Sequence, residues 1–370
     1  MLEEGIIRPV KSPWAFPVVI ATKKDVLPRF CVDYRLLNAR IKPILWPISL
    51  IEEIFNDLQG SIIYILLYFF SGYWKIKMEE ALKDVTAFTT RYGNFRFEVM
   101  PFGLINAPST FQKMMDDILK DIPFARAYLD DVVIFSKSMD DHMRHVSAVF
   151  DRISSHRLRL LVRKCVFCQE KFHLLCHVVT PNGIEVDPEK VKVVSDAPAP
   201  TDKTGVRSFV GLAGYYRRFI RDFAHITVPL HALTSPKSPF GWTEEACEAF
   251  LRLKEALTTA PVLAFPDFDL PFIVDTDASS RAVGAVLAQK QEGRIHPIQY
   301  ASLSLNSAEK NYSACEREAV AVFFALRKFR IFLLSGQRFD LLTDHQALRY
   351  ALEKKDVHGL IARWLDFLAE

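Results

Sequence analysis

Two adjacent carboxylates precede an apolar run in the stretch Tyr128-Leu129-Asp130-Asp131-Val132-Val133-Ile134-Phe135-Ser136. The run at residues 132–135 is short and rich in β-branched side chains, which is typical of a buried β-strand. Buried charge is costly unless it is paired or binds a metal, so the two carboxylates need an explanation. They can form a tight hairpin turn that directs both carboxylates at Mg²⁺, because Mg²⁺ prefers oxygen ligands. An ordinary solvated turn is the alternative, because Asp is common in turns. This stretch alone leaves both interpretations open.

The composition is that of a globular protein with more than one domain. A chain of 370 residues predicts two or three domains with a substantial core. A hydrophobic content of 50% and a charged content of 25% exclude wholesale disorder. The formal net charge of +3 is nearly balanced, so any basic surface for nucleic acid must be local.

The sequence predicts an intracellular location. Six cysteines in 370 residues are too few for a disulfide scaffold and indicate a reducing compartment. The opening Leu2-Glu3-Glu4-Gly5 is charged, unlike the apolar core of a signal peptide. The longest apolar run, residues 62–70, is too short to span a bilayer, so no membrane partner is expected.

The segment before the hairpin mixes strands and helices irregularly, as in an α+β domain. Residues 16–22 and 29–35 predict two strands of a hairpin with the basic tip Lys23-Lys24-Asp25. That tip is either a solvated turn or part of a phosphate site. The apolar segment at residues 61–74 predicts a strand buried on both faces. We also expect a helix at residues 51–58, a strand at 95–100 and a helix that ends near Leu119.

Several motifs in this segment resemble those of reverse transcriptases, in kind and in order. They are Cys31-Val32-Asp33-Tyr34-Arg35-Leu36-Leu37-Asn38, Ser71-Gly72-Tyr73, Met100-Pro101-Phe102-Gly103-Leu104, Asn106-Ala107-Pro108 and Tyr128-Leu129-Asp130-Asp131. The motif sequences are most similar to those of the Pol polyprotein of gypsy-type LTR retrotransposons, and the resemblance runs essentially from Leu2 to Glu370. It implies an α+β multidomain fold, with a right-hand polymerase of fingers, palm and thumb followed by a truncated ribonuclease H-like domain.

The resemblance implies four parts along the chain. Residues 1–185 would form the fingers and palm, with the fingers incomplete at the N-terminus, and residues 186–235 would form thumb-like helices. Residues 236–262 would be a short connection, and residues 263–370 a C-terminally truncated ribonuclease H-like domain. A helix start at Asp187-Pro188 supports this division, because Asp is a good N-cap and proline suits the first helical position.

In the polymerase family, three aspartates hold the two metal ions of the catalytic centre. Asp130 and Asp131 match two of them, whereas the third position, three residues before Ser71-Gly72-Tyr73, holds Tyr68. A phenol with a pKa near 10 is a poor Mg²⁺ ligand at neutral pH. We therefore expect this chain to have lost most of its polymerase activity. By resemblance the nucleotide-binding residues are Lys23 and Arg29 at the triphosphate, Tyr73 beneath the sugar, and Phe102 and Gly103.

A Cys/His run, Cys165-x2-Cys168-x4-His173-x2-Cys176, has the residue types of a zinc site. A zinc knuckle would need its last cysteine at the position of Val178. The apolar neighbours favour a buried hairpin instead. By resemblance this segment is the primer-grip hairpin, in which the residue before His177 is usually glycine and is Cys176 here.

Residues 203–223 predict one amphipathic helix of the thumb. Its apolar face would carry Phe209, Leu212, Tyr216, Phe219, Ile220 and Phe223. Its other face would carry the nucleic-acid-binding residues Arg207, Arg217, Arg218 and Arg221, together with Gly211 and Gly214. Interior glycines cost about 1 kcal/mol each against alanine, so their position suggests close approach to a phosphate chain. A solvated basic face is the alternative.

The C-terminal region predicts a ribonuclease H core. Strands are expected at residues 270–277, 282–287 and 295–300, followed by a helix through Phe329 and a returning strand at 339–343. Asn306, with Glu309 three residues on, is the expected helix cap. The resemblance assigns Asp277, Glu318 and Asp344 to three of the four acidic metal ligands and places the fourth beyond residue 370.

The resulting expectation is an RNA-directed DNA polymerase with a ribonuclease H domain and two Mg²⁺ ions per active site. The polymerase centre would lack one ligand and the nuclease centre its fourth. Expected partners are an RNA or DNA template, a DNA primer, deoxynucleoside triphosphates and an RNA/DNA hybrid. The alternative is a non-enzymatic nucleic-acid-binding relic or co-opted protein that keeps the fold. Metal-dependent nucleotide incorporation would separate the two.

Overall fold

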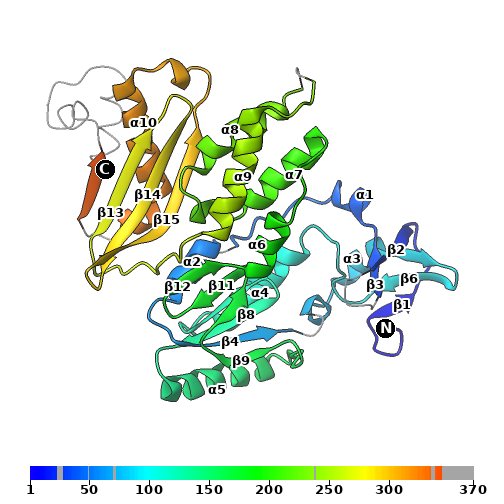
Figure 1. Ribbon diagram of the computed structural model, residues 1–370. Coiled ribbons are helices and arrows are strands. Elements are labelled where there is room, and N and C mark those ends of the chain that lie inside the picture. Colours follow the sequence, from blue (N-terminus) through cyan, green and yellow to red (C-terminus); the bar gives the residue numbers. More distant parts are fainter. Residues whose placement is uncertain (23–27, 49, 70–71, 237–238, 335–337, 344–370) are drawn as a thin grey trace, which may run out of the picture. The chain divides into compact units, whose positions relative to one another are not determined.

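The structure is a computed structural model that describes residues 1–22, 28–48, 50–69, 72–236, 239–334 and 338–343. The chain divides into two compact units, Met1–Glu170 and Lys171–Glu370. Each unit builds its own sheets (Figure 1). Each unit also has its own clusters of buried hydrophobic residues.

The first unit begins with a five-stranded sheet. Its strands are β1 (Ile7–Pro9), β2 (Phe16–Thr22), β3 (Pro28–Val32), β5 (Phe88–Thr90) and β6 (Gly93–Phe97). They lie in the order β1-β6-β5-β2-β3, with β2 parallel to β5 and the other neighbours antiparallel. The predicted hairpin is confirmed, because β2 and β3 pair from Val18 to Thr22. Its second strand ends earlier than expected, at Val32.

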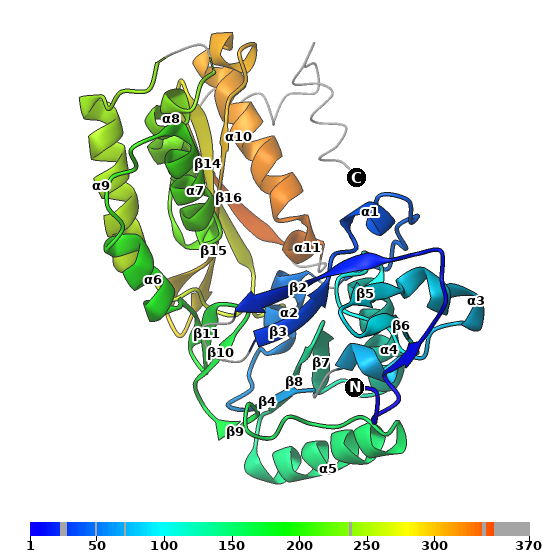
Figure 2. The same ribbon diagram turned by 90° about the vertical axis from the view of Figure 1, so that its right-hand side faces the viewer.

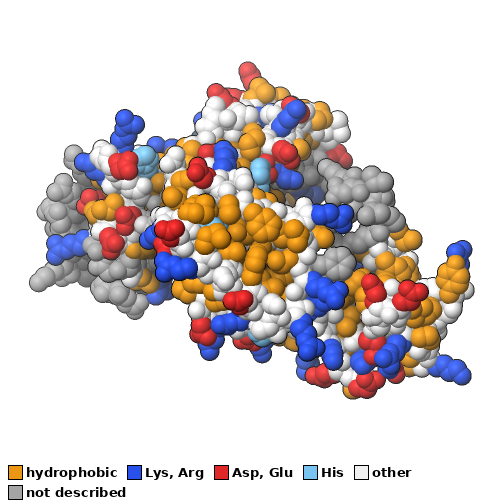
Figure 3. Space-filling model, turned by 90° about the horizontal axis from the view of Figure 1, so that it is seen from below, with side chains coloured by type: hydrophobic (Ala, Val, Ile, Leu, Met, Phe, Trp, Pro, Cys, Tyr) orange, Lys and Arg blue, Asp and Glu red, His pale blue; other side chains and the backbone are white. Residues whose placement is uncertain are grey.

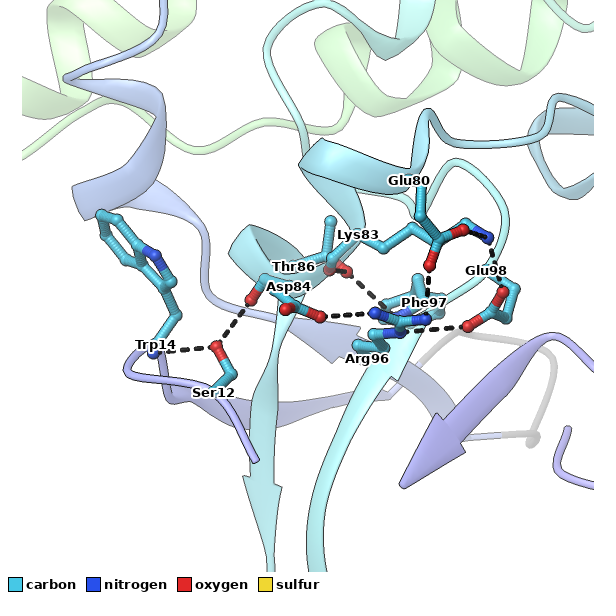
Figure 4. A network of polar contacts seen from close by, with 9 residues as sticks. All are labelled: Ser12, Trp14, Glu80, Lys83, Asp84, Thr86, Arg96, Phe97 and Glu98. Atoms are coloured by element: carbon cyan, nitrogen blue, oxygen red, sulfur yellow. Dashed lines mark hydrogen bonds and ion pairs between the residues drawn. The ribbon is translucent and has the colours of Figure 1, made fainter. Parts of the chain in front are cut away.

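A network of ion pairs attaches β6 to two short helical turns that precede β5 (Figure 4). The turns are α3 (Glu80–Lys83) and η2 (Asp84–Thr86). The guanidinium of Arg96 lies 2.6 Å from Asp84, and the ammonium of Lys83 lies 2.7 Å from Glu98. These hydrogen-bonded carboxylates, Asp84 above all, raise the pKa of Arg96. The network fixes the position of β6 against the turns.

A second sheet carries the Asp-Asp hairpin. Its strands are β4 (Ile63–Tyr68), β7 (Ala125–Tyr128), β8 (Asp131–Ser136) and β9 (Val166–Gln169). They lie in the order β7-β8-β4-β9 and all pair antiparallel. The predicted strand buried on both faces is confirmed, because every side chain from Ile63 to Leu67 is buried. The strand is shorter than expected and ends at Tyr68.

Two helices, α4 and α5, pack against this sheet. Besides α3 and η2, the described helical segments of the unit are α1 (Arg35–Asn38), α2 (Ile51–Asp57), η1 (Gly72–Lys75), α4 (Ala107–Leu119) and α5 (Met139–Ser155). α4 packs against β7, and α5 packs against β8 (Figures 1 and 2). α5 begins at Ser138, whose hydroxyl accepts a hydrogen bond from the backbone N–H of Asp141. The predicted helix at residues 51–58 and the one ending at Leu119 are both confirmed.

The second unit opens with a small sheet followed by helices. The strands are β10 (Phe172–Leu174), β11 (His177–Thr180) and β12 (Gly183–Val186), and the helices are α6 (Pro188–Ser195), α7 (Lys203–Gly214), η3 (Arg217–Phe219), α8 (Phe223–Leu233) and α9 (Glu244–Thr258). The predicted start of α6 is confirmed, because the Asp187 carboxylate accepts a hydrogen bond from the backbone N–H of Glu189. Gly183, at φ +140°, has to be glycine: a Cβ there would stand 2.2 Å from the Leu263 carbonyl oxygen.

The single helix predicted at residues 203–223 is wrong. The chain leaves the α-helix after Gly214 and starts α8 only after Asp222, which adopts a left-handed conformation at φ +57°. The hydroxyls of Tyr215 and Tyr216 donate to the carbonyls of Leu175 and Cys176, in the turn between β10 and β11. These tertiary contacts outweigh the helical periodicity of the segment. Leu212, expected on the apolar face, is exposed.

The C-terminal part of the second unit is a four-stranded sheet with a long helix on one face. The elements are β13 (Phe272–Ala278), β14 (Ala282–Gln291), β15 (Arg294–Ser304), η4 (Glu309–Asn311), α10 (Ala314–Lys328), α11 (Arg330–Leu333) and β16 (Phe339–Thr343). The order is β15-β14-β13-β16, with β16 parallel to β13. The predicted strands are confirmed. Val274 packs with Ala325 of α10 in one buried cluster, and Figure 2 shows α10 lying along the sheet.

The predicted helix cap at Asn306 is wrong for the long helix. Asn306 and Glu309 do exchange the expected hydrogen bonds, but the turn that they close leads only into the short helical turn η4. The long helix α10 starts after Ser313, which forms a capping box with Glu316. Both pairs have the same spacing in the sequence, so the pattern alone cannot choose between them.

The surface carries both charges beside apolar side chains. Figure 3 shows Lys and Arg interspersed with Asp and Glu around a hydrophobic area on the face seen from below. This agrees with the nearly balanced formal charge of +3. Among the described residues, no helix is both long and apolar enough to cross a membrane.

Candidate functional site

The Asp-Asp hairpin is a two-residue turn between β7 and β8. Tyr128 pairs with Asp131 across the two strands, so Leu129 and Asp130 form the turn itself. Leu129 adopts φ +52°, a left-handed conformation that is unusual for a residue other than glycine. The tight turn places the two carboxylates next to each other at the start of β8. It is the hairpin that the sequence predicted.

Tyr68 lies directly opposite Asp131 on the neighbouring strand β4. Burial and the nearby Asp130 raise the pKa of Asp131 to about 6. Burial, followed by the charges of Asp131 and Cys165, raises the pKa of Tyr68 to about 12. The phenol is therefore neutral at pH 7, while Asp131 is largely ionised. The pairing brings together the three positions at which the polymerase family has aspartates.

These side chains do not fit a pair of divalent ions. Two carboxylates and a neutral phenol supply less charge and fewer oxygen ligands than three carboxylates. Within the part of the chain that the structure describes, no group of three or more His, Cys, Asp or Glu side chains is arranged to hold a metal. The misfit arises at Tyr68, because the two hairpin carboxylates are present.

The expected nucleotide-binding residues on the palm side lie together. The ring of Tyr73 is 4.9 Å from that of Phe102 and 5.2 Å from that of Phe111, measured between centroids. Gly103 adopts φ +94°, so the turn after Phe102 requires glycine. Lys23 lies outside the described residues, and only the backbone of Arg29 is described, in β3.

Three amide side chains that sequence analysis missed hold the turns of this region. Asn38 bonds the Gly103 carbonyl at 2.8 Å and the Ile105 N–H at 2.9 Å. Asn106 bonds the backbone of the segment at residues 42–44, and the fully buried Gln112 bonds the turn at Leu129. The motifs containing Asn38 and Asn106 were noticed, but only as marks of resemblance. Their hydrogen bonds join segments far apart in the chain, which a local pattern cannot reveal.

The four arginines expected on one helix face do not share a helix. Arg207 belongs to α7 and donates to the carbonyl of Thr234 at 3.0 Å. Arg217 and Arg218 belong to η3. Arg221 lies 3.4 Å from the carboxylate of Asp275 on β13. The common basic face is therefore wrong, because the helix that would have aligned these residues is interrupted.

The expected nuclease acids occupy two elements of the C-terminal sheet. Asp277 is exposed near the end of β13 and pairs with Gly284, whereas Glu318 is buried on α10. Asp344 lies outside the described residues. It follows Thr343, which pairs in parallel with Thr276, the neighbour of Asp277.

A small cavity of about 240 Å³ adjoins Asp277, lined among others by Asp222, His225, Arg252 and Gly284. A Cβ on Gly284 would stand 2.5 Å from the Asp222 carboxylate, so this carboxylate reaches the sheet because residue 284 is glycine. Burial, together with Asp277 and Asp275, raises the pKa of Asp222 against the opposing effects of Arg221 and His225. Sequence analysis missed Asp222, which lay in the predicted helix.

The Cys/His run is divided between two sheets. Cys165 lies beside Tyr68, and the following β9 pairs with β4 and is largely exposed, so the expected buried hairpin is only partly right. The hairpin that does form joins β10 to β11 through Leu175 and Cys176. Cys176 stands at φ +59°, the conformation for which glycine is usual.

Comparisons with known proteins identify the family. Residues 21–179 match the family described as reverse transcriptase (RNA-dependent DNA polymerase), and residues 242–341 match the RNase H-like domain found in reverse transcriptase. The chain is 37% identical over 378 residues to the Pol polyprotein from transposon 297 of Drosophila melanogaster. It is 36% identical over 388 residues to that from transposon gypsy of the same organism. The chain belongs to the family of gypsy-type retrotransposon Pol polyproteins.

The relatives are considerably longer than this chain. Both alignments cover 100% of the chain, but only 35% of the transposon 297 polyprotein and 37% of the gypsy polyprotein. The chain therefore spans little more than a third of the length of these relatives.

Solved structures agree with the expected fold. A foamy viral protease–reverse transcriptase in complex with double-stranded DNA superimposes with a TM-score of 0.87 and 23% identity, covering 100% of this chain and 78% of that one. The same viral protein with an RNA/DNA hybrid gives a TM-score of 0.82 and 23% identity, with 100% and 51% covered. At this identity the likeness establishes the fold. The predicted α+β polymerase followed by a ribonuclease H-like domain is confirmed.

Proposed function

We propose that the chain is the reverse transcriptase and ribonuclease H part of a retrotransposon Pol polyprotein, with a polymerase centre that Tyr68 impairs. Family membership supports RNA-directed DNA polymerase and ribonuclease H activity. Reverse transcriptase and ribonuclease H families generally use divalent metals. The proposal is that each active site is built for two Mg²⁺ ions and that, in this chain, the polymerase centre lacks one of the ligands needed to hold both.

The pairing of Tyr68 with Asp131 carries the proposal. In an antiparallel sheet, directly opposed residues have Cβ atoms about 5 Å apart, so Tyr68 adjoins the carboxylate pair. A third carboxylate at this position would stand close enough to share a cation with Asp131. The phenol instead fills that space with an uncharged ring. Loss of one charged ligand weakens the stabilisation of charge in phosphoryl transfer, which depends mainly on electrostatics and positioning.

The proposed domains follow the resemblance: fingers and palm at residues 1–185, thumb-like helices at 186–235, a connection at 236–262 and the ribonuclease H-like domain at 263–370. The proposed metal ligands and catalytic residues are Asp130, Asp131, Asp277, Glu318 and Asp344. The proposed nucleotide contacts are Lys23, Arg29, Tyr73, Phe102 and Gly103. The contact of Tyr73 with Phe102 supports a shared nucleotide site on the palm.

The proposed substrates are an RNA or DNA template with a DNA primer, deoxynucleoside triphosphates and an RNA/DNA hybrid. The structural neighbours are complexes with double-stranded DNA and with an RNA/DNA hybrid, which supports nucleic acid as the substrate. Arg207, Arg217, Arg218 and Arg221 remain the proposed nucleic-acid contacts. Arg217, which is exposed on η3, is the strongest of the four.

A second candidate function is template binding without catalysis. Tyr68 favours it, because the substitution removes a catalytic charge but leaves the surrounding sheet intact. The two functions separate in one pair of assays on the purified chain, primer extension and template-primer binding. The proposal expects binding without appreciable extension, and extension once Tyr68→Asp supplies the carboxylate. Wild-type extension equal to that of the Tyr68→Asp variant would refute the proposed impairment, and failure of both to bind template-primer would refute the family function.

A further inference from the structure

The turn that carries Asp130 and Asp131 is attached to a buried glutamine of α4. Gln112 is fully buried and accepts a hydrogen bond at 2.7 Å from the backbone N–H of Leu129. Its side-chain nitrogen donates to the carbonyl of Ala127 at 2.9 Å and to Asp116 at 2.8 Å. Because both N–H donors and the carbonyl oxygen are used, the amide can take only one orientation.

The bond to Leu129 bears on the shape of the turn. Leu129 stands at φ +52°, a conformation that costs a residue other than glycine about 1–2 kcal/mol. Such a conformation persists only where the surroundings hold it. Leu129 immediately precedes Asp130, so a relaxed turn would shift both carboxylates. The hydrogen bond that Leu129 donates to Gln112 is thus a direct restraint on where the two carboxylates stand.

Asp116 extends the restraint to the segment after α1. Its second carboxylate oxygen accepts a hydrogen bond at 2.7 Å from the indole N–H of Trp46. The ammonium of Lys113 lies 5.2 Å from the centre of the same indole, within cation–π range. Gln112 and Asp116 are four residues apart on α4, so they project from one side of the helix. Trp46, Asp116 and Gln112 together form what we call the Trp46 bridge.

We propose that Gln112 and Asp116 are positioning residues of the Asp130–Asp131 turn, held in place by Trp46. The Trp46 bridge acts on the backbone of the turn and touches neither carboxylate in its hydrogen bonds. Its role in catalysis rests on the proposed function, whereas its role in shaping the turn does not. The two parts therefore need separate measurements.

The first measurement is amide hydrogen exchange of the turn in the full wild-type chain and three variants. Gln112→Met keeps the length of the side chain and removes its hydrogen bonds, and Asp116→Asn leaves one oxygen for two donors. Asp117→Asn is the matched control, because Asp117 is exposed on the same helix. We expect the Leu129 amide to exchange about tenfold faster in Gln112→Met, less so in Asp116→Asn, and unchanged in Asp117→Asn. Equal exchange in wild type and Gln112→Met would overturn the proposal.

The second measurement uses the Tyr68→Asp background and the Mg²⁺ concentration that gives half-maximal primer extension. We expect Gln112→Met to raise this concentration several-fold while template-primer affinity stays the same. Adding Leu129→Gly should restore the parental value, because glycine adopts positive φ without the restraint. A loss caused by poorer core packing would not be rescued in this way, so failure of the rescue would count against positioning.

The controls keep the outcomes distinct. If Gln112→Met does not fold, Asp116→Asn, with its partly exposed side chain, carries both measurements. If Tyr68→Asp itself incorporates no nucleotide, the proposed function fails, and hydrogen exchange still decides whether the Trp46 bridge shapes the turn.

Discussion

The two candidate centres place their carboxylates in different surroundings. Asp131 lies opposite the phenol of Tyr68, and burial raises the pKa of the Asp131 carboxyl group to about 6. Asp277 is exposed and faces Gly284, which leaves a cavity of about 240 Å³ beside it. At the first centre a phenol from the neighbouring strand therefore stands beside the carboxylate, whereas at the second the position opposite the carboxylate carries no side chain. A chain can therefore keep a catalytic motif although the centre to which the motif belongs has lost a ligand.

The largest expected effect is on ribonuclease activity and tests the role of Asp277. Asp277→Asn should reduce cleavage of an RNA/DNA hybrid by the purified chain about 100-fold or more, because removing a charged ligand costs several kcal/mol of transition-state stabilisation. Asp275→Asn is the control, since Asp275 lies two residues earlier on the same face and pairs with Arg221. A ribonuclease assay on a labelled hybrid measures both. If the two variants lose activity equally, Asp277 has no special role.

The next effect is on stability and tests how tightly the first unit is packed between Gly72 and Phe111. A Cβ added at Gly72 would stand 2.7 Å from the ring of Phe111, which is fully buried. We expect Gly72→Ala to lower the free energy of unfolding of the first unit by about 1–3 kcal/mol, as overpacking of cores does. Urea unfolding followed by hydrogen exchange resolves the two units. An unchanged free energy of unfolding for the first unit would mean that the side chains around Gly72 can move to accommodate a methyl group.

A pH effect on stability comes from Asp131. Its folded pKa of about 6 is above the unfolded value of 3.8, so stability falls as pH rises through that window. We expect Asp131→Asn to raise the free energy of unfolding by about 1–2 kcal/mol at pH 7 and to make little difference below pH 4. Urea unfolding at both pH values checks this, with the exposed Asp117→Asn as control. Equal gains at pH 4 and pH 7 would rule out the carboxylate charge as the cause.

The smallest expected effect is on stability and concerns Gly284, the residue opposite Asp277. A Cβ added at Gly284 would stand 2.5 Å from the Asp222 carboxylate, which is the outer end of a side chain that is 42% exposed and pairs with Arg221. We expect Gly284→Ala to cost under about 1 kcal/mol, clearly less than Gly72→Ala. The same unfolding experiment compares them. A cost at Gly284 equal to or above that at Gly72 would contradict the contrast between the two regions.

The sequence predicted the elements whose pattern is local. The apolar run from Ile63 to Leu67 and the carboxylates before Val132 defined two paired strands of the palm. Asp187-Pro188 correctly marked the start of α6, because an N-cap acts within one helical turn. The Tyr68 substitution was also visible, since the family pattern fixes its distance from Ser71-Gly72-Tyr73.

The sequence could not predict the features that depend on distant partners. The helix predicted across Gly214 breaks because Tyr215 and Tyr216 bond a turn about forty residues earlier. The cap predicted at Asn306 was wrong for α10, which starts after Ser313 and packs on the sheet, because Ser313 and Glu316 have the same spacing as Asn306 and Glu309. Gln112 lies on an amphipathic helix with nothing in its neighbours to mark it, and only the fold brings Leu129 to it.

The most direct test of the proposed impairment of the polymerase centre is single-turnover primer extension with Mg²⁺ by wild type, Tyr68→Asp and Tyr68→Asn. Asp and Asn have nearly the same size, so their difference isolates the carboxylate charge from the removal of the ring. We predict that Tyr68→Asp extends the primer about 100-fold faster than wild type, and that Tyr68→Asn stays within a few-fold of wild type. Equal rates for the Asp and Asn variants, or a wild-type rate matching Tyr68→Asp, would contradict the role given to Tyr68.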